Sequence, residues 1–73
     1  MNSTYFRSFH IYKVIQYSGL RKEPCLNAKI QQYIKPGYKV LCTNISMDTS
    51  GNTWIKTPFG WLCAINEGEV FIR

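Results

Sequence analysis

The 73-residue sequence has few of the side chains from which catalytic and metal sites are built. It contains one histidine, His10, four acidic residues and three cysteines, and no Cys-x-x-Cys pair. A zinc site needs about four ligands at recognisable spacing, and triad chemistry needs a nucleophile, a base and an orienting group. Glycine motifs for phosphates or dinucleotides are also absent from the sequence. We therefore expect no metal, no cofactor and no catalytic activity.

Long apolar runs are missing as well. No stretch approaches the ~20 apolar residues that a membrane span needs, and residues 1–20 lack the pattern of a signal peptide. We expect no membrane span, and a cytoplasmic location unless the chain is a fragment of a secreted protein. The odd number of cysteines argues against a disulfide framework. Cys42 and Cys63 each lie inside an apolar run, which predicts that both are core residues.

The composition is sufficient for one small folded domain with an uneven charge. Hydrophobic residues make up 45% and aromatic residues 15% of the chain, and the net charge is +5. Residues 1–39 carry one acid, Glu23, and seven of the nine basic residues, namely Arg7, Lys13, Arg21, Lys22, Lys29, Lys35 and Lys39. A basic half is attracted to polyanions or to an acidic partner, or is simply a solvated face.

The chain is organised around residues 52–64. Two β-favouring runs, 54–57 and 60–64, are separated by Pro58-Phe59-Gly60, which predicts a tight hairpin that carries Trp54 and Trp61. Residues 1–10 are a leader or an extra strand, and 11–73 form the domain. The remaining predictions are a strand at 11–17, a long loop at 18–29, a strand at 38–45, a polar turn at 46–53, a turn at 66–68 and a last strand at 70–72.

Residues 26–34 fit two structures. Leu26, Ile30, Tyr33 and Ile34 match one face of a helix, which Pro36-Gly37 would end. Ile30 and Ile34 also fit the alternation of a strand that runs into a Pro-Gly turn. About five strands with turns every 8–15 residues predict a small all-β barrel.

Four pieces of the chain, in order, resemble the bacterial SH3-like (SH3b) domain family over residues 12–65. Arg21 and Pro24 match the Arg and Pro of the family's Leu-Asn-Val-Arg-Ser-Gly-Pro stretch. The other matches are Gly37 and Val40 to a Gly-x-x-Val turn and strand, Trp54 to a Trp-x-x-Val strand, and residues 60–62 to Gly-Trp-Val. The chain departs at Ser18-Gly19 and Lys22-Glu23. The resemblance implies an SH3-like barrel of about five strands with a long first loop, and it favours a strand over a helix at 26–34.

The resemblance also implies a non-catalytic binding module. Its aromatic groove would lie between the long loop and the hairpin turns, with candidate residues Tyr17, Arg21, Lys22, Glu23, Tyr33, Tyr38, Trp54 and Trp61. Trp54 is expected to line this groove, whereas Trp61 fits either the groove or the core. The expected partner is a protein or peptide, which includes the peptidoglycan stem of a cell wall. The alternative is nucleic acid bound by the basic N-terminal half.

Overall fold

A computed structural model describes residues 6–73 of the chain. Eight strands lie in this part of the chain: β1 His10–Lys13, β2 Ser18–Arg21, β3 Ile30–Ile34, β4 Lys39–Cys42, β5 Asn44–Met47, β6 Thr53–Thr57, β7 Gly60–Asn66 and β8 Glu69–Val70. The described residues form no helix, and so none that could cross a membrane. The predicted all-β class is confirmed.

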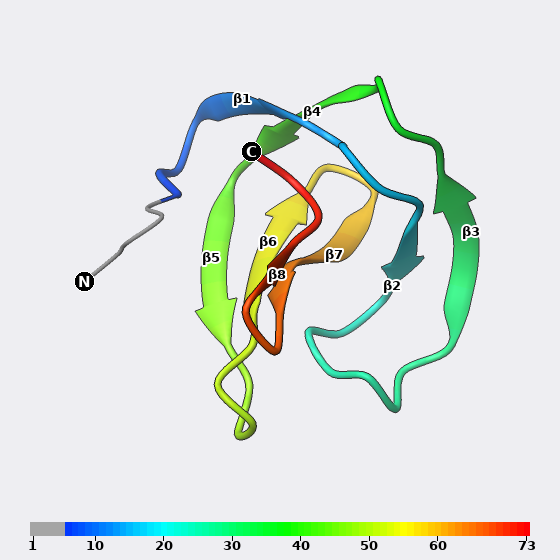
Figure 1. The fold of residues 1–73 in the computed structure, drawn as a ribbon, viewed down its shortest axis with the longest axis vertical. Coiled ribbons are helices and arrows are strands. Elements are labelled where there is room, and N and C mark those ends of the chain that lie inside the picture. The colour runs from blue at the N-terminus through cyan, green and yellow to red at the C-terminus, as the bar shows by residue number, and fades with distance from the viewer. Residues whose placement is uncertain (1–5) are drawn as a thin grey trace.

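The strands form two sheets that curve around a shared interior (Figure 1). One sheet pairs β1 with β4, and the other has the order β3-β2-β7-β6-β5, with β8 added to β7. All these pairs are antiparallel, and a bridge between Val14 and Ile72 ties the end of the chain to the residue after β1. The end of β1 and the last residues of the chain therefore lie side by side.

The predicted strand at 38–45 is divided between the two sheets, and the predicted strand at 11–17 is shorter than expected. The predicted strand at 38–45 bends at Thr43, so that β4 pairs with β1 and β5 pairs with β6. The predicted strand at 11–17 ends at Lys13, and the chain re-enters the other sheet at Ser18, within the predicted loop. A strand that bends can switch sheets at a corner, so eight short strands replace the predicted five. Residues 1–5 of the predicted leader lie outside the described residues.

The segment at 26–34 contains a strand, as the family resemblance implied. Residues 26–29 belong to a loop, and β3 begins at Ile30 and pairs with β2. Ile30 and Ile34 are its half-buried residues, whereas the three residues between them are exposed. A five-residue strand with two anchoring side chains is consistent with the edge position of β3 in its sheet.

Both predicted turns on either side of β7 are confirmed. Thr57 pairs with Gly60, and its hydroxyl donates to the Gly60 carbonyl at 3.0 Å and accepts from the Phe59 N–H at 3.1 Å. At the other end Glu67 and Gly68 have φ values of 51° and 83° between the paired residues of β7 and β8. Two consecutive positive φ angles match the right-handed twist of a two-residue hairpin.

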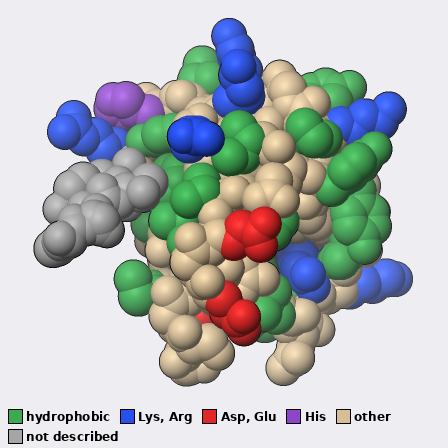
Figure 2. All heavy atoms as spheres, in the orientation of Figure 1, with side chains coloured by type: hydrophobic (Ala, Val, Ile, Leu, Met, Phe, Trp, Pro, Cys, Tyr) green, Lys and Arg blue, Asp and Glu red, His purple; other side chains and the backbone are tan. Residues whose placement is uncertain are grey.

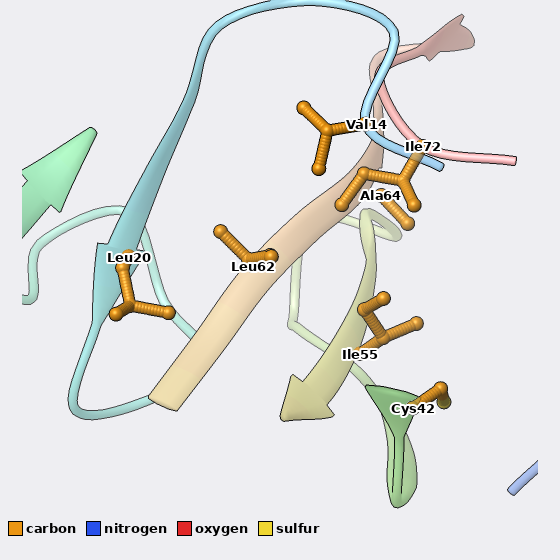
Figure 3. Close-up of a cluster of buried hydrophobic side chains, with 7 residues drawn as sticks. All are labelled: Val14, Leu20, Cys42, Ile55, Leu62, Ala64 and Ile72. Atoms are coloured by element: carbon orange, nitrogen blue, oxygen red, sulfur yellow. The ribbon is translucent and has the colours of Figure 1, made fainter. Parts of the chain in front are cut away.

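The core lies between the sheets (Figure 3). Its buried side chains are Val14, Leu20, Cys42, Ile55, Leu62, Ala64 and Ile72. Strand alternation explains why two of these residues are buried. Leu62 and Ala64 face inward from β7, while the other residues of β7 are half-buried. Cys42 is buried as predicted, but Cys63 lies on the opposite face of β7 and is only half-buried, so its assignment to the core is wrong.

Candidate functional site

The described residues enclose a groove of about 240 Å³ that brings together three of the predicted site residues, Tyr17, Arg21 and Tyr33. We call it the aromatic groove. It is lined by Tyr17, Ser18, Gly19, Arg21, Leu26, Ile30, Tyr33, Cys63, Asn66 and Phe71. Tyr17 and Tyr33 are each 61% exposed. Three of the ten lining residues are therefore aromatic, and two of these three are open to solvent.

The groove exists because two neighbouring strands diverge. The ladder between β2 and β7 has one pair of partners, Arg21 with Trp61. Beyond this pair β2 continues along β3, while β7 continues along β6 and β8. The lining residues from the first part of β2 and from Cys63 to Asn66 of β7 therefore lie on opposite sides of a gap that backbone hydrogen bonds do not close.

Arg21 holds the loop at one end of the groove. One nitrogen of its guanidinium donates to the carbonyls of Leu26 and Ala28, at 3.0 and 2.7 Å. The carbon at the centre of the guanidinium lies 5.9 Å from the centroid of the Trp54 ring, within the range of a cation–π contact. The loop between β2 and β3 is thus fastened to the sheet through a side chain that also lines the groove.

Trp54 is fully buried, which corrects the expectation that it lines the groove. It pairs with Cys63 and Ser46 across the sheet, on the face opposite to the core residue Ile55. Its indole N–H donates to a carboxylate oxygen of Asp48 at 2.9 Å. Trp54 therefore supports the groove from beneath, between Arg21 and the turn after β5.

Asp48 organises that turn. Besides the Trp54 indole, its carboxylate accepts hydrogen bonds from the backbone N–H groups of Ser50 and Asn52, both at 3.0 Å, and from the Asn52 amide at 3.2 Å. These donors stabilise the charged form, and the indole contributes most to lowering the pKa of Asp48 below its ordinary value of 3.8.

Because the folded protein holds the pKa of Asp48 below its unfolded value, the stabilisation is present above about pH 4 and is lost as the pH falls through the folded pKa. We expect wild type to lose stability relative to Asp48→Asn as the pH is lowered from 5 to 2, measured by urea denaturation at each pH. A difference between the two proteins that stays constant over this range would contradict the assignment.

Two polar groups at the β7 side define what the groove offers a ligand. Burial raises the pKa of the Cys63 thiol to about 11, so it stays protonated at neutral pH and is a poor nucleophile. The side-chain oxygen of Asn66 is buried and has no hydrogen-bond partner among the described residues. An unsatisfied buried acceptor is unfavourable, and rotation of the Asn66 side chain toward the groove would expose it to a donor.

The other predicted site residues lie elsewhere. Lys22 and Glu23 line a separate, wide hollow of about 570 Å³, which shares Ile30 with the groove. Tyr38 is exposed but lines neither hollow. Trp61 is half-buried on the outer face, where the Lys56 ammonium lies 6.0 Å from its ring centroid. The predicted site is therefore divided among several surfaces.

Sequence analysis missed Asn66 and Phe71, which form the far side of the groove. The sequence predicts Asn66 only as part of the turn at 66–68, and Phe71 only as part of the strand at 70–72. The alternation of faces along an extended segment could have identified Phe71, because it precedes the core residue Ile72 and so faces the opposite side. Their place in the groove depends on contacts between distant segments: β8 pairs with β7, and the Phe71 carbonyl accepts from the N–H groups of Ile15 and Gln16, just before β2.

A third hollow, of about 250 Å³, is a weaker candidate for specific binding. It is lined by Leu20, Gln32, Ile34, Val40, Thr57, Phe59 and Leu62, and Phe59 is 81% exposed. The Thr57 hydroxyl is already engaged within its own hairpin. This hollow offers few free polar groups to orient a ligand, in contrast to the aromatic groove.

Comparisons with family models, curated proteins and solved structures give no match to this chain.

Proposed function

We propose that the chain is a non-catalytic, SH3-like recognition module that binds an extended peptide in the aromatic groove. The observation that carries the proposal is the pair of exposed tyrosines, Tyr17 and Tyr33, beside Arg21 in one groove. Tyrosine and arginine are enriched among the residues that dominate binding energy at protein interfaces. A tyrosine presents a large apolar ring together with a polar tip, which suits a surface that is only partly dry.

The size of the groove favours a peptide over a compact small molecule. Small-molecule sites usually enclose about 300–1,000 Å³, and this groove holds about 240 Å³ and is open. Such a volume accepts one or two side chains while the rest of the ligand lies along the surface. Proline-rich segments suit aromatic grooves of this kind, because their extended conformation is largely preformed.

The buried Asn66 oxygen adds a polar requirement. Asn66 lines the groove, and a peptide backbone N–H would reach its buried oxygen once the side chain turns toward the groove. The resemblance to SH3b domains adds the stem peptide of peptidoglycan as a specific candidate, since a stem peptide carries the same backbone donors. Both ligands place a peptide between the two tyrosines.

Selection from a phage-displayed library of twelve-residue peptides tests the proposal. We expect selected peptides to lose roughly 30-fold in affinity with Tyr17→Ala or Tyr33→Ala, the effect of an interface hot spot. Tyr38→Ala is the matched control, because Tyr38 is 60% exposed but lies outside the groove. Fluorescence anisotropy with labelled peptides measures the affinities.

A second probe separates the two kinds of peptide. Purified peptidoglycan should retain wild type and release Tyr33→Ala if the stem peptide is the ligand, and should retain neither if the ligand is a protein segment. Equal losses with Tyr33→Ala and Tyr38→Ala, or a library from which no peptide is enriched, would contradict the proposed groove.

A further inference from the structure

The outer face of β1 and β4 carries cations directly opposite one another. Lys13 and Lys39 are partners in the ladder between these strands. Lys13 also exchanges two backbone hydrogen bonds with Arg73, at 2.8 and 2.9 Å, so Arg73 lies opposite it on the other side. Residues opposite one another on antiparallel strands point to the same face. Lys39, Lys13 and Arg73 therefore form a row across three adjacent chain segments.

The register also places this row outside the core. Tyr12 and Val40, the partners next to Lys13 and Lys39, pack against the core cluster from the inner face. The residues that alternate with them must point outward, and Lys13, Lys39 and Arg73 are all exposed. Like charges directly opposite one another destabilise a sheet, so the row is unfavourable for folding and calls for an anionic partner.

Apolar side chains continue the same face. Ile11 and Leu41 are the next outward-facing partners after Lys13 and Lys39. Ile11 is 66% and Leu41 38% exposed, and Phe9, just before β1, is 77% exposed. In Figure 2, Lys and Arg side chains and apolar side chains lie together in the upper part of the molecule, where β1 and the C-terminus lie in Figure 1. The acidic side chains in this view lie below them.

We propose that this face, with Lys13, Lys39, Arg73, Ile11 and Leu41, docks on the surface of a lipid bilayer that contains anionic lipids. Cations near such a surface attract its headgroups, and exposed apolar side chains enter the boundary between headgroups and acyl chains. Nucleic acid would use the same cations. The aliphatic pair Ile11 and Leu41 favours lipid, because aliphatic chains insert among acyl chains but do not stack on bases.

Sedimentation with sucrose-loaded vesicles tests this proposal. Wild type is expected to bind vesicles of 70% phosphatidylcholine and 30% phosphatidylserine, and to bind pure phosphatidylcholine at least tenfold less. Each neutralised cation should lower the partition coefficient roughly fivefold, so Lys13→Gln/Lys39→Gln should lower it about 25-fold. Lys22→Gln/Lys29→Gln is the control, because it removes the same charge from the separate wide hollow.

The apolar side chains are tested by a second pair of variants. Ile11→Ser should also weaken vesicle binding, whereas Met47→Ser, at an equally exposed residue of β5, should not.

Thermal unfolding provides a readout that separates docking from folding. Lys13→Gln/Lys39→Gln relieves a repulsion, so its Tm should be equal to or higher than that of wild type while vesicle binding falls. Equal binding to both vesicle compositions, or an equal loss with the control pair, would overturn the proposal. Binding of a 20-base-pair DNA duplex that the same variants weaken, without vesicle binding, would assign the face to nucleic acid instead.

Discussion

Trp54→Ala is expected to remove a large part of the folding free energy of this protein. Truncation of a buried tryptophan costs about 3–5 kcal/mol, and a domain of this length has a total stability of roughly 4–11 kcal/mol. The indole is fully buried and is the partner of both Arg21 and Asp48. Its loss leaves a cavity beneath the groove and takes a donor from the carboxylate that organises the turn after β5. Urea denaturation followed by circular dichroism measures the change.

Two controls identify the cause of this loss. Trp61→Ala removes the same group from a half-buried position, and it should cost clearly less. Trp54→Phe fills most of the volume but lacks the N–H, so it should lie between wild type and Trp54→Ala. If Trp54→Ala cost less than about 1 kcal/mol, the indole could not occupy the interior position described.

The local parts of the fold could be predicted because local chemistry determines them. Pro58 and Gly60 define the turn between β6 and β7, and Gly68 permits the positive φ of the next turn. Each of these turns needs only the residues next to it in the sequence. The identity of β3 was ambiguous from its own pattern, since Ile30 and Ile34 fit both a helix and a strand, and its pairing with β2 resolves the ambiguity.

What could not be predicted depends on pairing between distant strands. A strand that bends at Thr43 has no local signature, because both of its halves are β-favouring. Trp54 is a residue type expected in a groove, but it is fully buried, with Arg21 over its ring and Asp48 at its indole N–H, and both partners come from other parts of the chain. Three residues of the groove could thus be predicted from their type, but neither the rest of its lining nor the depth at which each residue lies could.

The same limit applies to the groove. Tyr17 and Tyr33 were predicted from their residue type, and the pairing of β2 with β3 places them near one another. Asn66 and Phe71 reach the groove because β7 and β8 continue past the point where β2 diverges. The shape of the groove therefore depends on the single Arg21–Trp61 pair, which makes the residue before Trp61 decisive.

Gly60→Ala is expected to destabilise the protein by about 2–5 kcal/mol and to weaken peptide binding in the groove. Gly60 has a φ of +150°, which L side chains rarely adopt, and a Cβ at this position would lie 2.7 Å from the carbonyl oxygen of Arg21. The atom that a Cβ would meet belongs to the backbone of β2 and cannot turn aside as a flexible side chain would, so β7 must move away from β2. That movement separates the one pair of partners, Arg21 and Trp61, that defines the end of the groove.

Gly51→Ala separates the two causes, because Gly51 has a φ of +87° but no atom of the described residues lies within 4 Å of its Cβ position. It should cost only the backbone strain, about 1 kcal/mol, and leave peptide affinity unchanged. Guanidinium denaturation and anisotropy with a selected peptide measure both quantities on the same proteins. Equal losses of stability in the two variants would show that close approach of β2 to β7 does not matter. An unchanged affinity in Gly60→Ala would show that the groove does not depend on the Arg21–Trp61 pair.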